Sequence, residues 1–296
     1  MSIPESQLQT WSHQGSVKQS ADTYNTIKNV LEDAAAPYAN KEFKVFLQGS
    51  YGNDTNIYAD SDVDVVICLN STYYADLSYL DESEKTNYNR DRIVASYEIA
   101  EFRKEVLDWL KKRFGSSVKS GKKAIAIAGN GNRRDVDVLP CAQHRRYNSY
   151  SSAATSRYNT GIVFWTTDGK EIINFPLQHM ENCTSKHQST SNRFKPNVRI
   201  IKNMRNEMIE RSIISPKSAP SYYLEGMLWN VPNPKFVNSY GDTFANYWNW
   251  LDDCVVADLV CANTLHFLVR DGHDICWNME DYTSTLTGLR KLWADW

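Results

Sequence analysis

Val45-Phe46-Leu47-Gln48-Gly49-Ser50 has the pattern of a short strand that enters a tight turn, and Asp62-Val63-Asp64-Val65-Val66-Ile67 begins twelve residues after Ser50. The second run is rich in β-branched residues, which predicts another strand. Side chains alternate between the faces of a strand, so Asp62 and Asp64 share one face and the valines face a core. Two neighbouring carboxylates repel each other, and such a pair is costly unless a cation binds to it.

The same pattern occurs again in Asp135-Val136-Asp137-Val138. If this strand lies beside the first, one of its acids supplies a third ligand at the same place. Two divalent ions held there would form a phosphoryl-transfer site. A single Asp-Val-Asp run is also typical of a strand edge with solvated acids, but two such runs together favour the metal site.

The turn Gly49-Ser50 adds a possible phosphate contact to this pattern. Gly49 permits the close approach of a phosphate, and the Ser50 hydroxyl and nearby backbone N–H groups can donate to its oxygens. A Gly-Ser pair alone is a common turn. Its position between one strand and an Asp-Val-Asp run makes the prediction specific.

The chain as a whole predicts an α/β (α+β) fold with a mixed sheet core and a C-terminal helical lobe. An amphipathic run from Val17 to Leu31 predicts a long N-terminal helix that braces the fold. We expect a catalytic core over residues 1–145 and a mainly helical lobe over residues 146–296. The other expected helices span 91–114, 197–211, 221–229 and 243–270, and the other expected strands span 124–128, 136–139, 162–165 and 172–173.

Composition and charge point to a cytoplasmic protein that handles anions. No apolar run is long enough to cross a membrane, and the N-terminus lacks the features of a signal peptide. The six cysteines form no C-x-x-C pair, which favours reduced thiols; a zinc site at Cys254, Cys261, His266 and His273 is a remote alternative. Residues 101–217 hold 22 Lys and Arg against 10 Asp and Glu, which suits a cleft for polyphosphate or nucleic acid.

These residues resemble a known family. Leu47-Gln48-Gly49-Ser50 followed by Ser61-Asp62-Val63-Asp64 is similar to the active-site signature of the DNA polymerase β-like nucleotidyltransferase superfamily. Within it the chain resembles the bacterial cGAS/DncV-like nucleotidyltransferases, the signal-making enzymes of anti-phage defence (CBASS). The supporting segments are Thr55-Asn56-Ile57, Gly129-Asn130-Gly131-Asn132-Arg133, Asp137-Val138-Leu139-Pro140-Cys141, Phe194-Lys195-Pro196 and Ser221-Tyr222-Tyr223-Leu224-Glu225.

The resemblance implies roles for individual residues. Asp62, Asp64 and Asp137 match the catalytic, metal-binding acids, and Asp135 ranks second because it lies two positions from the matching place. Lys202 matches a lysine that reaches the donor triphosphate. The remaining candidate nucleotide-binding residues are Gln48, Gly49, Ser50 and Ser221, to which we add Asn174, a polar residue in an apolar run that is suited to reading a base edge.

The implied activity is metal-dependent joining of nucleoside triphosphates into a cyclic di- or trinucleotide second messenger. Two Mg²⁺ ions, for which Mn²⁺ can substitute, are the expected cofactors, and a product-sensing effector protein is the expected partner. We expect a monomer that needs neither a membrane nor nucleic acid. Two alternatives stay open: another transferase of the superfamily that acts on RNA, a protein or a small molecule, and a non-catalytic nucleotide- or RNA-binding module. The bases, the linkage and any activator are left undetermined by the sequence.

Overall fold

The structure is a computed structural model that describes residues 2–15, 17–58, 62–273 and 275–296. Ser61 of the signature segment lies outside these residues. The chain divides into two compact units, a sheet unit of Lys18–Gln48 and Ser61–Pro176 and a helical unit of Met1–Val17, Gly49–Asp60 and Leu177–Trp296. The predicted division at residues 145/146 stays a prediction.

The sheet unit contains a mixed sheet in the order β1-β2-β5-β4-β3, with β6 paired to β5 and β7 paired to β6. Only the β2–β5 pair is parallel among the described strand pairs; the rest are antiparallel. The strands are β1 (Phe43–Leu47), β2 (Val63–Asp76), β3 (Val118–Ser120), β4 (Ile125–Ile127), β5 (Val136–Ser149), β6 (Arg157–Trp165) and β7 (Glu171–Asn174). The mixed sheet predicted from the sequence is confirmed.

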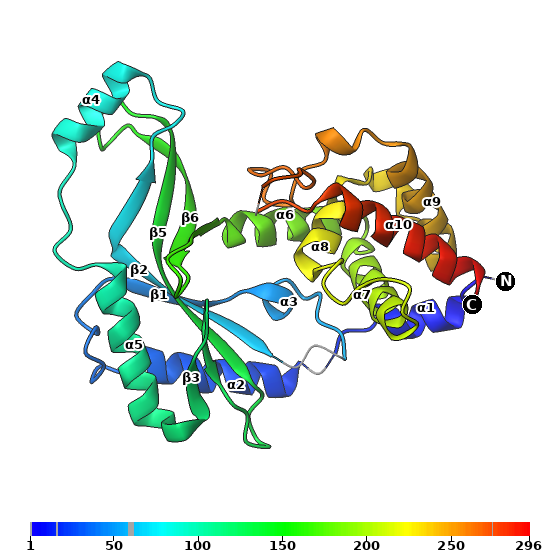
Figure 1. The fold of residues 1–296 in the computed structure, drawn as a ribbon, viewed down its shortest axis with the longest axis horizontal. Helices are drawn as coiled ribbons and strands as arrows, with labels where there is room; N and C mark the ends of the chain where they lie inside the picture. Colours follow the sequence, from blue (N-terminus) through cyan, green and yellow to red (C-terminus); the bar gives the residue numbers. More distant parts are fainter. Residues whose placement is uncertain (1, 16, 59–61, 274) are drawn as a thin grey trace. The chain divides into compact units, whose positions relative to one another are not determined.

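Helices α2 (Lys18–Leu31) and α5 (Ile99–Phe114) pack on the sheet and on each other, so they cover the same face (Figure 1). The indole N–H of Trp109 fastens α5 to α2 by donating to the Val30 carbonyl at 2.7 Å. The helix expected over 91–114 begins later than predicted, at Ile99, and residues 92–98 are not helical. The short helix α4 (Glu82–Asp91), which ends where the expected helix was to begin, was not predicted.

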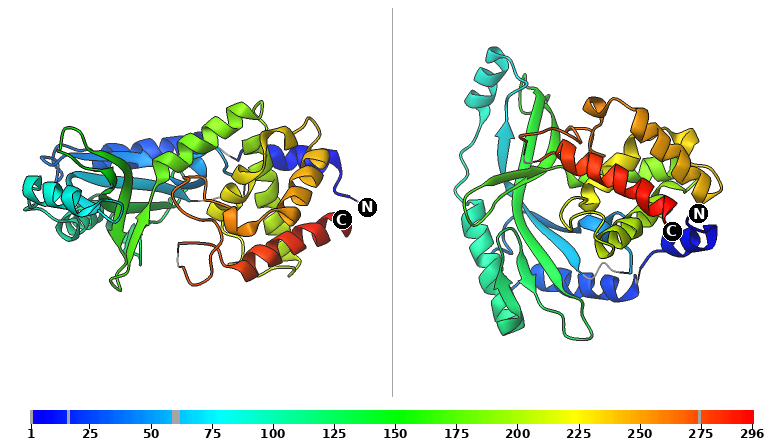
Figure 2. Two further views of the ribbon diagram at one scale, coloured as in Figure 1. Left: turned by 90° about the horizontal axis from the view of Figure 1, so that it is seen from above. Right: turned by 45° about the vertical axis from the view of Figure 1, so that its right-hand side comes forward.

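The helical unit has an apolar core of its own. Figure 2 shows its helices from two further directions. Its helices are α1 (Glu5–Ser12), α3 (Gly49–Gly52), α6 (Pro176–Ser189), α7 (Phe194–Glu210), α8 (Ser221–Asn230), α9 (Tyr240–Asp253) and α10 (Met279–Ala294). Short 3-10 helices occur at Asn233–Lys235 and Val256–Asp258 in this unit and at Gly115–Ser117 in the sheet unit. Helices α1, α6 and α10 were not predicted. In the described part of the chain, no helix has both the length and the hydropathy that a bilayer crossing requires.

The single helix expected over 243–270 is wrong. Helix α9 ends at Asp253, and the following chain forms the isolated bridges Val260↔Phe267 and Val269↔Trp277. Its backbone groups bond elsewhere: the Val260 N–H donates to the Asn230 side chain at 3.1 Å. Apolar residues continue through this segment because it lines the core, and their spacing alone does not distinguish a buried loop from a buried helix.

Candidate active site

The candidate metal ligands lie at the start of the two parallel strands. Asp64 of β2 and Asp137 of β5 are direct register partners, and so are the valine pairs on either side of them. Those valines are almost fully buried. Because side chains alternate along a strand, the buried valines turn both aspartates to the opposite face of the sheet. Asp62, one residue before β2, is exposed.

The charges of Asp62 and Asp135 act on the carboxyl group of Asp137. Burial raises the pKa of Asp137, and the negative charges of Asp62 and Asp135 raise it further. Ionised carboxylates at such a position are destabilised by burial and by like charge. A divalent cation would offset both penalties, since it places a positive charge beside the carboxylates.

Asp135 has a different task from Asp137. Its Oδ1 accepts the backbone N–H of Gly129 at 2.7 Å, which closes the loop between β4 and β5. It is also exposed. The carboxylate that stabilises the loop is therefore the one that the sequence ranked second as a ligand.

The donor set fits magnesium. Mg²⁺ prefers hard oxygen ligands and is commonly held by one or two carboxylates together with phosphate oxygens and water. Asp62, Asp64 and Asp137 offer only carboxylate oxygens. Two oxygen-bound ions of this kind are the usual arrangement for in-line displacement at phosphorus.

The turn after β1 begins close to Asp64, because the end of β1 pairs with the start of β2. The backbone N–H of Gln48 donates to the Asp64 carbonyl at 3.0 Å. Gln48 Oε1 is buried and has no hydrogen-bond partner among the described residues. Gly49 follows with a φ of 69°, a value that favours glycine, and starts the four-residue helix α3 that contains Ser50.

Lys202 and Ser221 lie in the helical unit with Ser50. Lys202 is fully buried on α7, and its Nζ donates to the Thr55 carbonyl at 3.0 Å. Ser221, the first residue of α8, accepts a hydrogen bond on its Oγ from Arg205 Nη1 at 3.1 Å. Lys202 and Arg205 of α7 thus donate to backbone and hydroxyl oxygens of the helical unit. That Lys202 and Ser221 contact a triphosphate stays a prediction.

Asn174 ends β7, where it pairs with Ile162 of β6 and is half-buried. The neighbouring Gly161 allows this strand to approach, because a Cβ there would lie 2.6 Å from the Asn174 carbonyl oxygen. Phe175 follows and is buried. The backbone around Asn174 is thus closely fixed.

Thr55, His179 and Glu225 form a buried polar group in the helical unit that sequence reasoning did not predict. Thr55 and Glu225 were noted only as parts of family segments, and His179 was not noted. The remote zinc alternative is not supported by the described residues, where the cluster with metal-ligand spacing is His179, Cys183 and Glu225 instead. The signal that could have identified Glu225 is a lone acid within the apolar run Tyr222–Leu228.

Comparison with known proteins agrees with this fold. The model of the cGAS/DncV-like nucleotidyltransferase C-terminal helical domain matches residues 181–294. The cyclic nucleotide synthase CdnE01 of Staphylococcus haemolyticus is 34% identical over 303 aligned residues, which cover 100% of both chains. The structure of the Rhodothermus marinus CdnE c-UMP-AMP synthase with Apcpp and Upnpp is similar, with a TM-score of 0.88 and 33% identity over 99% of this chain and 97% of that chain.

A further similar structure is that of the Elizabethkingia meningoseptica CdnE cyclic dinucleotide synthase with GTP and Apcpp, with a TM-score of 0.78 and 29% identity over 99% of this chain and 98% of that one. The chain belongs to the cGAS/DncV-like nucleotidyltransferase family. Within that family it is a cyclic dinucleotide synthase of the CdnE type. The other transferases and the binding module considered above are thereby set aside, and of the two product sizes the dinucleotide is supported.

Proposed function

We propose that Asp62, Asp64 and Asp137 hold two Mg²⁺ ions and that this site joins two nucleoside triphosphates and then cyclises the product. The observation that carries the proposal is the register pairing of Asp64 with Asp137 on parallel strands. It supports a shared site for acids that are more than seventy residues apart in the sequence. The raised pKa of Asp137 supports it as well.

In each step a ribose hydroxyl attacks the α-phosphate of a triphosphate, a P–O bond to that hydroxyl forms, and the bond to pyrophosphate breaks. The bound ions would supply a lowered pKa for the attacking hydroxyl and neutralisation of the leaving group. The carboxylates of this chain fix the reacting groups in place, and Asp137 is positioned on the strand face where it can accept the hydroxyl proton. Ser50, Lys202 and Ser221 are the proposed contacts for the β- and γ-phosphates, with Gln48 and Gly49 shaping the turn.

The proposed substrates follow the relatives in part. The R. marinus enzyme is a cyclic UMP-AMP synthase, and the E. meningoseptica enzyme is a cyclic dipurine nucleotide synthase. Related enzymes thus differ in base choice. We propose that Asn174 reads the base edge with its amide in this chain, because it is the polar residue at the end of β7 on a closely fixed backbone.

The proposed role of the product is that of a second messenger in anti-phage defence, recognised by an effector protein. We propose that synthesis of this messenger requires no nucleic acid and that the protein acts in the cytoplasm.

The test is incubation of the purified chain with Mg²⁺ or Mn²⁺ and all four labelled triphosphates, followed by phosphatase and chromatography. We expect a phosphatase-resistant product that is absent from an Asp62→Asn/Asp64→Asn variant. Omitting each triphosphate in turn then identifies the two bases. A product made equally by the double variant would contradict the proposed site.

A further inference from the structure

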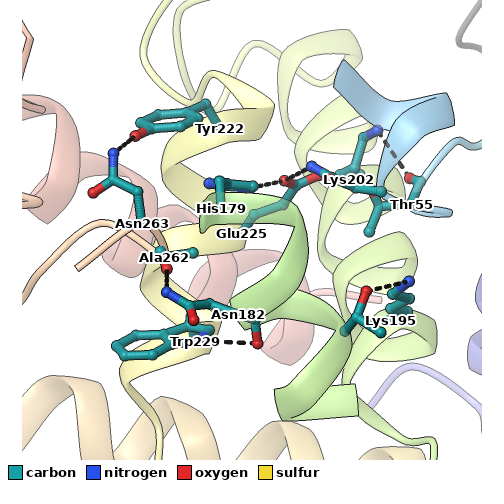
Figure 3. A network of polar contacts seen from close by, with 12 residues as sticks. Thr55, His179, Asn182, Lys195, Lys202, Tyr222, Glu225, Trp229, Ala262 and Asn263 are labelled. Carbon is teal, nitrogen blue, oxygen red and sulfur yellow. Dashed lines mark hydrogen bonds and ion pairs between the residues drawn. The ribbon is translucent and has the colours of Figure 1, made fainter. Parts of the chain in front are cut away.

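Glu225 is a buried carboxylate on α8 that receives hydrogen bonds from two other parts of the helical unit (Figure 3). Asn53 Nδ2 donates to its Oε2 at 2.9 Å, and the Thr55 hydroxyl donates to its Oε1 at 2.5 Å. His179 Nε2 of α6 lies 2.6 Å from Oε2. Both oxygens of the carboxylate are therefore occupied.

Such a group is costly to bury unless its bonds are complete. Burial alone would raise the pKa of Glu225, but the hydrogen bonds from His179 and Thr55 and the charge of Lys202 hold it below its ordinary value. The carboxylate is thus maintained as an anion. Removing one donor would leave a buried charge partly unsatisfied.

The residues it holds, Asn53 and Thr55, belong to the same turn as Ser50. The Thr55 backbone N–H donates to the Ser50 carbonyl at 2.9 Å, and the Asn53 N–H donates to the Gly49 carbonyl at 3.1 Å. The side-chain bonds to Glu225 and the backbone bonds to residues 49 and 50 therefore fix one rigid loop. Its other side is held by α7, where Lys202 donates to the Thr55 carbonyl.

Two further cations of α7 bind the adjoining residue. Lys195 Nζ lies 3.0 Å from Asp54 Oδ2, and Arg199 Nη1 donates to the Asp54 carbonyl at 2.6 Å. Asp54 has a φ of 54°, a conformation that a non-glycine residue keeps only when its surroundings require it. The loop is therefore held by bonds to two helices of its own unit, α7 and α8, and His179 of α6 supports it only through Glu225.

A metal site is the alternative explanation, since His179, Cys183 and Glu225 place their ligand atoms within 4.8 Å of one another. The surrounding groups argue against it. Both oxygens of Glu225 already have hydrogen-bond partners in Asn53, Thr55 and His179, and these partners stabilise the anion without a cation.

We propose that Glu225 is a positioning residue for catalysis: through Asn53 and Thr55 it holds the loop that contains Ser50 in the conformation that binds the triphosphate. This inference rests on the proposed contact between Ser50 and the triphosphate. Glu225 itself touches no substrate. Its effect reaches the nucleotide through the loop alone.

The test uses Thr55, because Glu225→Gln removes a buried acceptor and is expected to impair folding. Thr55→Val deletes the donated hydroxyl at nearly constant volume, and Thr55→Ser retains it. Thr243→Val is the matched control: Thr243 is equally buried in the same unit, and its hydroxyl bonds to the Val237 backbone, away from the loop. Ser50→Ala and the Ser50→Ala/Thr55→Val double variant complete the set.

KM and kcat for the triphosphates are measured well below each melting temperature. We expect Thr55→Val to raise KM about tenfold or more, the change that follows from weakening a charged hydrogen bond. Thr55→Ser should stay near wild type, and Thr243→Val should lose thermal stability without a change in KM. The KM of the Ser50→Ala/Thr55→Val double variant should be little higher than that of Ser50→Ala, since both changes act on one contact with the triphosphate.

Different failures have different meanings. Ser50→Ala with an unchanged KM would overturn the proposed triphosphate contact. An effect of Ser50→Ala without any effect of Thr55→Val on KM or kcat would overturn the positioning role and leave the contact intact. Stoichiometric zinc in the purified protein that is lost in Cys183→Ser would also overturn it, because the cluster would then be a metal site.

Discussion

Asp64 and Asp137 are direct partners across the only parallel strand pair that the described part of the sheet contains. Parallel neighbours in register turn their side chains to the same face, so two acids distant in sequence are brought side by side by backbone pairing alone. The buried valines on both sides of each acid fix that register, because a slip by one residue would turn the valines into solvent. Backbone pairing within the sheet therefore sets the positions of Asp64 and Asp137 relative to each other.

Asn174→Ala should weaken the choice between bases. If the Asn174 amide bonds a base edge, its removal costs about 1–3 kcal/mol of discrimination, or roughly 5- to 150-fold in the ratio of kcat/KM between triphosphates. Competition between pairs of labelled triphosphates measures this ratio. Asn132→Ala, in an exposed loop of the same unit, should leave it unchanged. An unaltered ratio in Asn174→Ala would remove Asn174 from base recognition.

Gly161→Ala should destabilise the end of the sheet where Asn174 lies. The added Cβ would meet the Asn174 carbonyl oxygen at 2.6 Å and the Phe175 ring at 2.9 Å, so β7 has to move. We expect a loss of about 1–3 kcal/mol in the free energy of unfolding, as for other overpacked positions. Urea titration of the variant and of wild type measures this difference in the free energy of unfolding.

The same substitution at Gly241 serves as the control. A Cβ at Gly241 comes no closer than 3.4 Å to its nearest neighbour, and Gly241 lies in α9, where alanine is the better helix former. Gly241→Ala should remain within about 1 kcal/mol of wild type. Equal losses at the two positions would show that close approach at Gly161 is not the cause.

The sequence predicted the sheet part of the site better than the helical part. The alternation of aspartate and valine is a local pattern, and it predicted which side chains share a face. The exact pairing of Asp64 with Asp137 comes from the structure, because a shift of two residues would pair Asp64 with Asp135 and leave the same side chains on the same faces. By contrast, the bonds among Thr55, His179 and Glu225 join three segments that no local pattern connects.

Errors in the helices have a similar cause. The apolar spacing after Asp253 fits a helix as well as a buried loop, and the chain there bonds to the Asn230 side chain instead. Lys202 lies on α7 together with Arg199 and Arg205. That its Nζ would bond the Thr55 carbonyl depends on tertiary packing, which helical periodicity does not describe.

Acid should destabilise the helical unit through His187. Burial, with the charges of Lys195 and Arg199, lowers the pKa of His187 from 6.5 to about 4, and its Nδ1 accepts the Lys195 backbone N–H. Between pH 6.5 and 4 the unfolded chain takes up a proton that the folded chain does not, so the stability present above pH 6.5 falls as the pH falls. After allowance for solvent screening, about 1–2 kcal/mol is lost in this window.

Thermal unfolding at pH 7 and at pH 4.5 measures this loss. His187→Gln should lose less stability than wild type between the two values, because glutamine does not titrate. His273→Gln, which removes an exposed imidazole, should lose as much as wild type. If His187→Gln follows the wild-type curve, His187 does not carry the acid sensitivity.

The most direct test of the proposed metal site compares Asp137→Asn, on β5, with Asp135→Asn, one residue before this strand. Asp137 faces Asp64, whereas the Asp135 carboxylate bonds the Gly129 N–H of a loop. The rate of cyclic dinucleotide formation at saturating Mg²⁺ and triphosphate should fall by about 10³-fold or more in Asp137→Asn and by less than about tenfold in folded Asp135→Asn. Equal rates for Asp137→Asn and wild type, or a larger loss in Asp135→Asn, would contradict the assignment of Asp137 as the third metal ligand.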